Sequence, residues 1–303
     1  MSEAFRIKRL CLIGVGLIGG SLLRALRRAG VVDEIVGCGR SRESLENALK
    51  LGVIDRIEQD PAKAVLAADM VVLAVPLGAM QSIFSAIAPA LATDAVLTDV
   101  GSAKGSVVKA AEQAFTELPS GFVPAHPIAG TEKSGVEASF AALFDGRRVI
   151  LTPTLQSSPT AIGRTRAMWQ ACGAEVIEMD IAHHDEVLAA TSHLPHMLAY
   201  SLVDMLARRD DSQEIFDYAA SGFRDFTRIA SSDPTMWHDI ALANQDALAI
   251  LLEQFSLDLQ RLATAVREGD SDYLKTLFTR AKQARDEFQG RGARDEERGK
   301  PAP

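Results

Sequence analysis

Hydrophobic and polar residues follow two different patterns along the chain, and the change comes near residue 180. Six short apolar runs precede this point, at residues 9–16, 34–39, 69–76, 95–102, 121–126 and 147–153. Segments with helical spacing accompany them at residues 19–30, 41–52, 77–91 and 102–115, with a final helix–strand unit at 158–180. Strands and helices that alternate at this spacing predict a parallel sheet covered by helices on both faces.

Beyond residue 180 the apolar spacing is helical throughout. Helices are predicted at residues 183–208, 214–230, 235–269 and 271–288. Asp180 and the pair Asp233–Pro234 are favourable helix starts, and Pro195 should bend the first of these helices by freeing a backbone carbonyl. The helix over 235–269 is apolar over much of its circumference between Ala241 and Leu259, which indicates burial against a partner subunit.

The composition is that of a water-soluble globular protein with room for two domains in 303 residues. The formal net charge of −8 argues against nucleic acid or an anionic membrane as the main partner. Three cysteines lie in apolar stretches and are interpreted as reduced core residues of a cytoplasmic protein. No apolar run has the length of a membrane span, and no signal peptide is evident.

A glycine-rich loop lies between the first apolar run and the first helical segment. Gly14, Gly16 and Gly19 form the spacing G-x-G-x-x-G in this strand–loop–helix context, which favours a dinucleotide pyrophosphate at the helix N-terminus. We therefore predict an α/β fold with an N-terminal Rossmann-type, doubly wound parallel sheet over residues 1–180. The expected cofactor-binding residues of the loop and of the third apolar run are Gly14, Gly16, Leu17, Ile18, Gly19, Val75 and Pro76.

The end of the second apolar run bears on the choice between NAD and NADP. NAD-binding folds usually carry an acid there for the ribose hydroxyls, whereas this chain has Gly39, Arg40, Ser41 and Arg42 before the first acid at Glu43. Cations and a hydroxyl suit a 2′-phosphate, so NADP is favoured over NAD. The alternative is that both arginines are solvated turn residues.

Polar residues follow the ends of the later apolar runs, where open α/β sheets bind ligands. Ser102 and Lys104 follow residues 95–102, and His126 follows residues 121–126, where Pro127 disfavours both helix and central strand. A histidine at this rim can accept the proton of an alcohol while hydride leaves the adjacent carbon. His126 is therefore the candidate general base.

Two further histidines lie in the helical half. His193 and His196 are three residues apart, on one face of a helix. With acidic residues at 185 and 186 they could form part of a metal site, but a clear third ligand is lacking, so no metal is expected. The adjacent pair His183–His184 places its side chains on different faces and is interpreted as a solvated helix start.

Arg224 and Arg228 are four residues apart and share one helix face. Two guanidinium groups placed in this way can hold carboxylates. A surface salt-bridge face that includes Asp225 is the alternative, and spacing alone favours it.

Five motifs carry a resemblance to a known family: "GVGLIGGS", "DVGSAK", "HPIAGTEKSG", "SHLPH" and "GFRDFTRIASSDPTMW". In order and spacing, over residues 7–288, they resemble the prephenate/arogenate dehydrogenases of tyrosine biosynthesis. The resemblance implies oxidative decarboxylation of prephenate to 4-hydroxyphenylpyruvate, or of L-arogenate to L-tyrosine, with NAD(P)⁺ as hydride acceptor. It also implies that residues 181–288 are an all-α substrate and dimerisation domain of a homodimer, and we predict that residues 289–303 are a disordered tail.

The resemblance assigns roles to individual residues. His126 would be catalytic, and Ser102 would orient it and the ring hydroxyl. Glu132 would modulate access to the site and pair with Arg228, which would bind a substrate carboxylate. The full set of expected substrate-binding residues is Ser192, His193, His196, Arg228, Thr131, Glu132 and Arg224.

Two other functions are compatible with parts of the sequence. A β-hydroxyacid or imine dehydrogenase also joins a Rossmann domain to helices, but it would not require "HPIAG" followed by "SHLPH". A dinucleotide-sensing regulator should carry a DNA-binding motif or a basic patch, and neither is evident.

Overall fold

The computed structural model of the chain describes residues 5–131 and 133–298. They form two compact units, divided between Leu248 and Ala249. The predicted boundary at residue 180 therefore lies inside the first unit. Helices that follow residue 180 contact the Rossmann half directly: the carboxylate of Asp239, for example, accepts a hydrogen bond of 3.2 Å from the backbone N–H of Gly78.

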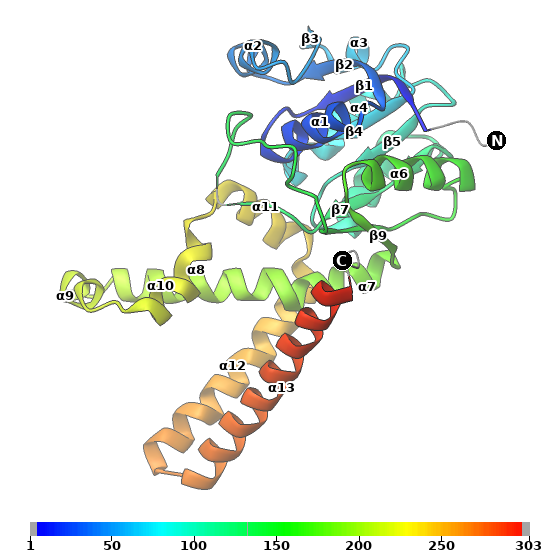
Figure 1. Cartoon of the computed structure of the whole chain (residues 1–303). Helices are drawn as coiled ribbons and strands as arrows, with labels where there is room; N and C mark the ends of the chain where they lie inside the picture. Colours follow the sequence, from blue (N-terminus) through cyan, green and yellow to red (C-terminus); the bar gives the residue numbers. More distant parts are fainter. Residues whose placement is uncertain (1–4, 132, 299–303) are drawn as a thin grey trace. The chain divides into compact units, whose positions relative to one another are not determined.

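A six-stranded parallel sheet forms the centre of the first unit (Figure 1). Its strands are β1 (Ile7–Ile13), β2 (Val32–Cys38), β3 (Arg56–Glu58), β4 (Met70–Leu73), β5 (Val96–Asp99) and β6 (Phe122–Val123). The order β3-β2-β1-β4-β5-β6 starts in the middle and proceeds outward in both directions. The predicted doubly wound Rossmann-type sheet is confirmed.

Helices cover both faces of this sheet because its strands are apolar on both faces. The covering helices are α1 (Leu17–Ala29), α2 (Arg42–Lys50), α3 (Pro61–Ala64), η1 (Leu77–Ala79), α4 (Met80–Ile87), α5 (Lys104–Ala114) and α6 (Pro159–Ala171). Along β1, Leu10 and Leu12 belong to one buried cluster, while Cys11 and Ile13 belong to the other. This alternation is the two-residue period of a strand, and it gives the unit a core on each side of the sheet.

The apolar run over residues 121–126 does not form one strand. It is divided at Pro124 between β6 and β7 (Ala125–Pro127), and β7 belongs to a second sheet with β8 (Arg148–Leu151) and β9 (Glu175–Glu178). β7 lies at the edge of this sheet and is antiparallel to β8. The edge position agrees with the missing donor of Pro127, and it places His126 just beyond the parallel sheet.

The helical part of the first unit begins where it is predicted to begin. It contains α7 (Ile181–Leu188), the π-helical turn η2 (Ala189–His193), α8 (Leu194–Ala207), α9 (Ser212–Asp217), α10 (Ser221–Thr227), η3 (Arg228–Ser231) and α11 (Pro234–Ala243). Asp180 caps α7, and Asp233 caps α11. Pro195, which we expected to bend this helix, lies in the first turn of α8, directly after the π-helical turn η2.

The single helix predicted over residues 235–269 is wrong. Asn244 interrupts it with backbone angles of φ −121° and ψ 36°, and the two parts are α11 and α12 (Gln245–Glu268). The side-chain amide of Asn244 donates a hydrogen bond of 2.8 Å to the backbone oxygen of Asp185. This contact between distant parts of the sequence compensates the break in the helix.

The second unit is a helical hairpin (Figure 1). Gly269, with a φ of +69°, ends α12, and α13 (Ser271–Arg298) follows. The predicted disordered tail is thus helical over residues 289–298, because its Gln, Ala, Arg and Glu residues are good helix formers. Residues 299–303 lie outside the described part of the chain.

Two further observations concern the described residues. The three cysteines, Cys11, Cys38 and Cys172, are buried and reduced. Within residues 5–131 and 133–298, no helix is both long and apolar enough to cross a membrane.

Candidate active site

The glycine loop between β1 and α1 has the geometry that a bound pyrophosphate needs. Gly14 has a φ of +100°, and a Cβ atom there would lie 2.2 Å from the backbone oxygen of Ala74. A Cβ atom on Gly19 would lie 2.5 Å from the oxygen of Gly14, so both positions require glycine. At Gly16, by contrast, a Cβ atom would enter open space at the start of α1, where no side chain caps the helix and no acid lies in the first turn. The loop therefore fits a dinucleotide at the helix N-terminus.

The neighbouring strand ends lie against this loop. The backbone N–H of Gly14 donates a hydrogen bond of 2.8 Å to the backbone oxygen of Cys38, the last residue of β2. Val75 follows β4 and borders Gly14, and the exposed Pro76 comes directly after it. The ends of β2 and β4 therefore lie against the loop, at Cys38 and Val75.

The turn after β2 has polar contacts of its own. Arg40 is exposed, whereas the hydroxyl of Ser41 caps α2 by accepting a hydrogen bond of 3.2 Å from the N–H of Ser44. Arg42 forms an exposed ion pair of 2.9 Å with Glu46. Of the three residues that we predicted to bind a 2′-phosphate, two thus have local partners.

A buried ion pair lies at the carboxyl end of β5. Asp99 and Lys104 are fully buried, with 2.5 Å between Oδ2 and Nζ. Burial lowers the pKa of Lys104, and the charge of Asp99 opposes this effect. Lys104 Nζ also donates a hydrogen bond of 2.6 Å to the backbone oxygen of Ala125. Asp99 Oδ1 accepts a hydrogen bond of 3.2 Å from the backbone N–H of the same residue. The backbone N–H and oxygen of Ala125, the residue before His126, are thereby fixed. The half-buried Ser102 lies between Asp99 and Lys104 in the chain.

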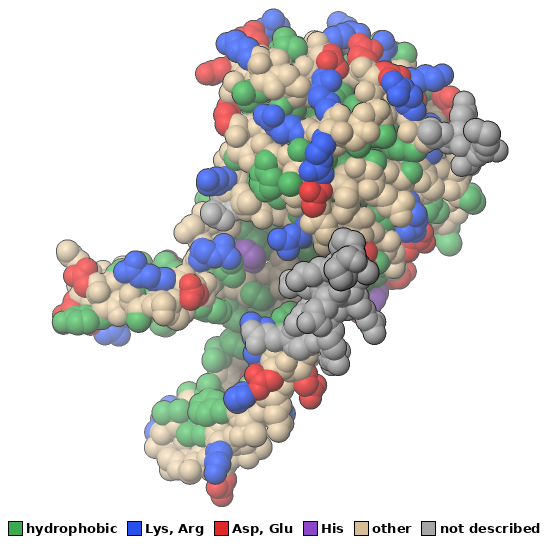
Figure 2. Space-filling model, viewed as in Figure 1, with side chains coloured by type: hydrophobic (Ala, Val, Ile, Leu, Met, Phe, Trp, Pro, Cys, Tyr) green, Lys and Arg blue, Asp and Glu red, His purple; other side chains and the backbone are tan. Residues whose placement is uncertain are grey.

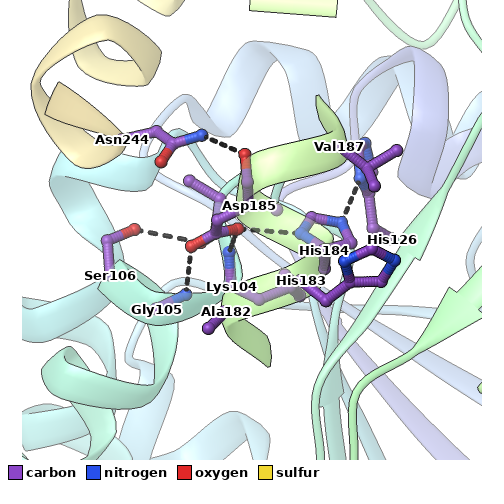
Figure 3. Close-up of polar contacts among 12 residues, drawn as sticks. Lys104, Gly105, Ser106, His126, Ala182, His183, His184, Asp185, Val187 and Asn244 are labelled. Carbon is purple, nitrogen blue, oxygen red and sulfur yellow. Dashed lines mark hydrogen bonds and ion pairs between the residues drawn. The ribbon is translucent and has the colours of Figure 1, made fainter. Parts of the chain in front are cut away.

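His126 contacts a second histidine that the sequence did not identify. Its Nδ1 lies 2.9 Å from Nε2 of His184, and Nδ1 of His184 lies 2.8 Å from Oδ1 of Asp185 (Figure 3). The prediction that His184 is a solvated residue at a helix start is wrong, because its side chain is fully buried. The adjacent His183 is exposed. Only the position of α7 against α5 distinguishes the two, and no local pattern encodes it.

The surroundings of His126 favour its neutral form. The pKa of His126 lies well below the usual value of a histidine, and burial is the main cause. The neighbouring His184, Lys104 and His193 lower it further, in that order. A neutral imidazole at neutral pH can accept a proton.

The histidines of η2 and α8 both have ring contacts with Trp237, which was not predicted as a site residue. The His196 ring stacks on Trp237 with 3.6 Å between ring centroids, and His196 Nδ1 donates 2.8 Å to the oxygen of Ser192. His193 is fully buried, and its Nδ1 accepts a hydrogen bond of 3.1 Å from the amide of Asn244. Burial lowers the pKa of His193 to about 4. Trp237 lies within one of the quoted motifs, which was the only signal for it.

Electrostatic influence connects these residues into one region. His193 lowers the pKa of His126, and His196 lowers that of His193. The pKa of His196 is itself lowered, first by burial, and the charge of Arg228 contributes. His126, His193, His196 and Arg228 therefore lie near one another in the first unit.

The remaining predicted residues lie at the edge of this region or outside it. Thr131 is exposed, and its hydroxyl accepts 3.2 Å from the N–H of Lys133. Glu132 lies outside the described residues. Arg224 is exposed, with its Nε donating 3.1 Å to the oxygen of Ala219. Arg228 begins η3 directly after α10. Among the residues that the structure describes, no group of three His, Cys, Asp or Glu side chains could hold a metal ion.

Comparison with known proteins gives matches over both halves of the chain. A family model described as "Prephenate dehydrogenase, nucleotide-binding domain" matches residues 22–178, and one described as "Prephenate dehydrogenase, dimerization domain" matches residues 180–280. The cyclohexadienyl dehydrogenase of Zymomonas mobilis is 41% identical over 284 residues, which cover 92% of this chain and 95% of that enzyme. The prephenate dehydrogenase of Bacillus subtilis is 36% identical, over 91% of this chain and 75% of that enzyme.

A solved structure agrees with these matches. Prephenate dehydrogenase from Aquifex aeolicus, in complex with hydroxyphenyl propionate and NAD⁺, superposes with a TM-score of 0.87. Its sequence is 37% identical, and the match covers 94% of this chain and 100% of that one. These findings support neither a β-hydroxyacid dehydrogenase nor a dinucleotide-sensing regulator.

Proposed function

The chain belongs to the prephenate dehydrogenase family, and from this membership we propose that it oxidises and decarboxylates prephenate to 4-hydroxyphenylpyruvate, or L-arogenate to L-tyrosine. The observation that carries the proposal is the pair of family matches, over residues 22–178 and 180–280, around a half-buried histidine beyond the parallel sheet whose neutral form is favoured. We further infer that residues 1–180 hold the cofactor and residues 181–288 complete the substrate site.

His126 is proposed as the general base. Its Nε2 accepts the proton of the ring hydroxyl while hydride leaves the same carbon. The substrate carboxylate then departs as CO₂, and its bonding electron pair restores the aromatic ring as a phenolate, which takes the proton back. A general base of this kind contributes about 10² to 10⁴ in rate. Ser102, on the connection between Asp99 and Lys104, is proposed to orient the base and the hydroxyl.

The substrate is an anion, so the binding residues must supply positive charge inside an acidic protein. Arg228 is proposed to bind a substrate carboxylate, because its charge already acts on His196 within the same site. His196, held by Ser192 and Trp237, presents its Nε2 for a further hydrogen bond. His193, Thr131, Glu132 and Arg224 are proposed to complete the substrate site, as the family resemblance implies.

A nicotinamide dinucleotide is the proposed cofactor, and when bound its ring supplies the hydride acceptor. Gly14 and Gly19 shape the loop so that the amides at the start of α1 face the pyrophosphate. Leu17 and Ile18 belong to the first turn of that helix. Val75, which borders Gly14, and Pro76 follow β4 and are proposed to contact the cofactor as well. The open space at Gly16 supports this placement, because a side chain there would occupy the pyrophosphate position.

We propose that NADP is favoured over NAD. Arg40 is exposed in the turn after β2, and Gly39 supplies no carboxylate to repel a 2′-phosphate. Ser41 and Arg42 could exchange their local partners for the phosphate, at the cost of a weak surface ion pair.

A homodimer formed through the helical domain is proposed as the functional assembly. The family model of residues 180–280 is described as a dimerization domain. Large apolar side chains are exposed along α11, α12 and α13, including Leu242, Ile250, Leu257, Val266 and Phe278, and Figure 2 shows hydrophobic side chains on the surface of the hairpin. A second copy would remove them from water. Light scattering that finds an active monomer at micromolar concentration would refute the dimer.

The decisive experiment is a spectrophotometric assay with prephenate and L-arogenate, each with NAD⁺ and NADP⁺. We expect reduction of the cofactor with at least one of the two substrates, together with release of CO₂. No turnover of either substrate, with the purified protein folded and able to bind the cofactor, would refute the proposal.

A further inference from the structure

We propose that His184 and Asp185 are positioning residues, which fix the tautomer of His126 so that Nδ1 carries the proton and Nε2 is the free base. The inference rests on the proposed catalytic role of His126. It assigns to α7 a task beyond packing: the helix would determine which ring nitrogen of the base can act.

The argument starts at Asp185, because its role as an acceptor is fixed. Its two carboxylate oxygens accept hydrogen bonds from backbone N–H groups at the N-terminus of α5 (Figure 3). Oδ1 accepts one of 2.7 Å from Lys104, and Oδ2 accepts one of 2.8 Å from Gly105. Burial raises the pKa of Asp185, but the hydrogen bonds from the His184 ring and from these two amides outweigh burial, and the net pKa is lowered. Asp185 is therefore a carboxylate, which can only accept.

The tautomer of His184 follows from its contact with this carboxylate. Nδ1 of His184 lies 2.8 Å from Oδ1 of Asp185 and must donate the proton of that hydrogen bond. In a neutral His184 ring, the proton on Nδ1 leaves Nε2 as an acceptor. The reverse tautomer would place a nitrogen lone pair against a buried carboxylate.

The tautomer of His126 follows in turn. Its Nδ1 lies 2.9 Å from Nε2 of His184, which is an acceptor, so Nδ1 of His126 must donate. The lone pair of His126 is then on Nε2, the nitrogen that faces away from His184. A neutral imidazole without a partner prefers its proton on Nε2, which leaves Nε2 without the lone pair that the proposed base needs. His184 is thus needed to reverse the intrinsic preference of His126.

Charged and titratable groups from every packed element act on His126. α5 contributes Lys104, η2 contributes His193, and α7 contributes His184 and, through it, Asp185. From β5, the carboxylate of Asp99 balances Lys104. When His126 takes up a proton during the reaction, Asp185 is the anion connected to it by hydrogen bonds.

Asp185 is itself held from two sides. Its carboxylate accepts hydrogen bonds from two backbone N–H groups of α5. Its backbone oxygen accepts a hydrogen bond of 2.8 Å from the side-chain amide of Asn244. The position of α7 is thereby fixed against both the Rossmann half and the α11–α12 junction. A positioning role requires such rigidity, because a mobile partner could not select one tautomer.

Histidine ¹⁵N NMR tests the inference directly in the full-length protein without substrate. The chain has only six histidines, and the signals of His126 and His184 can be assigned from His126→Gln and His184→Gln. We expect the Nδ1–H form for both residues in the wild type. An Nε2–H form of His126 in an active wild-type enzyme would overturn the inference, whatever the variants do.

Kinetics of two variants separate positioning from packing. His184→Leu removes the acceptor, so His126 should shift to the Nε2–H form and kcat should fall about 10²-fold, with KM and cofactor affinity within about twofold. His184→Gln keeps an acceptor oxygen and should recover most of the loss. His183→Leu, at the exposed neighbouring position, is the matched control and should resemble the wild type.

Each further outcome has a defined meaning. A kcat of His184→Leu within twofold of the wild type would overturn the inference. If His184→Leu does not fold, the inference is still tested by the ¹⁵N measurement of the wild-type tautomers and by the kcat of His184→Gln. A wild type that turns over neither prephenate nor L-arogenate would refute the proposed function, while the ¹⁵N measurement would still report whether His184 and Asp185 fix the ring of His126.

Discussion

Asp99 and Lys104 form a fully buried ion pair that binds both the N–H and the oxygen of Ala125, the residue before the proposed base. Two charges without access to water are costly unless each has its partner. This pair connects the end of β5, the start of α5 and the edge strand β7 in one cluster. The backbone at His126 is consequently fixed by charge rather than by apolar packing alone.

Removal of one partner of this pair should strongly destabilise the protein. Lys104→Met leaves the Asp99 carboxylate buried without a counter-ion, and we expect a loss of about 3–5 kcal/mol in the free energy of unfolding. Urea unfolding of the wild type and the variant measures it. Arg28→Met, which breaks the exposed pair with Asp145, is the control and should cost at most about 1 kcal/mol. Similar losses in the two variants would contradict the buried-pair argument.

The proposed base gives the strongest expected effect on rate. His126→Ala should lower kcat by about 10²-fold or more, because it removes the proton acceptor. Cofactor affinity should change little, since the glycine loop is untouched. Steady-state kinetics and cofactor titration measure the two quantities, with the exposed His238→Ala as control. A His126→Ala enzyme with half of the wild-type turnover would exclude His126 from the mechanism.

Arg228→Ala should act mainly on substrate binding. Loss of a charged hydrogen bond to a carboxylate is worth about 1.5–3 kcal/mol, so KM should rise by roughly one to two orders of magnitude. Arg209→Ala removes an exposed arginine paired with Asp211 and serves as control. An unchanged KM with a lowered melting temperature would instead identify Arg228 as a residue of the surface salt-bridge face.

The end of β2 offers a test of cofactor preference. A Cβ atom on Gly39 would meet only Leu45, at 3.7 Å and 3.9 Å, so Gly39→Asp should fold normally. The new carboxylate should favour the ribose diol of NAD and repel a 2′-phosphate, shifting the ratio of the two kcat/KM values by about tenfold, or about 1.4 kcal/mol.

Arg40→Ala completes this comparison and should weaken NADP selectively. A wild type that strongly prefers NAD, together with an Arg40→Ala variant whose use of NADP is unchanged, would mean that Arg40 only faces solvent.

Stability should fall as the pH drops below the ordinary pKa of histidine, about 6.5. His126, His193 and His196 all have lowered pKa values in the folded protein, so the unfolded chain binds protons that the folded one excludes. The stabilisation is complete above about pH 6.5 and is lost towards the folded pKa values, which for His193 is about 4.

Urea unfolding between pH 8 and pH 5 measures this loss. The window lies above the titration of ordinary aspartates, so histidines dominate it. His193→Gln should reduce the slope, while the exposed His183→Gln should not. A wild-type unfolding free energy that is constant over this range would contradict the argument.

The parts of the site that could be predicted from the sequence are those with local backbone requirements. Gly14 and Gly19 are identifiable because no other residue fits their positions. Asp180 is identifiable because a helix start needs an acceptor for its free N–H groups. The parallel sheet follows from the alternation of strands and helices, and His126 could be identified from its position at the end of an apolar run as well as from the family motifs.

The rest depends on contacts between distant segments. His183 and His184 are neighbours of one type, yet α5 buries only the second. Asn244 is tolerated within helices, and its place in the break is explained by its contacts with the distant Asp185 oxygen and His193 ring. Trp237 could be taken for a core residue until His196 is found stacked on it. Such pairings arise from tertiary packing, which hydrophobic spacing does not encode.

The π-helical turn η2 separates two sets of residues that evolution could alter independently. An α-helix rotates by about 100° per residue, and a π turn accommodates one extra residue. Deletion of one residue within Ala189–His193 would therefore turn every side chain of α8 by about that angle and remove His196 from Trp237. His184 and Asp185, which precede the turn, would keep their contacts with His126 and α5. An insertion or deletion in this turn would therefore alter the substrate-binding side chains of α8, while the hydrogen bonds that connect Asp185, His184 and His126 would be kept.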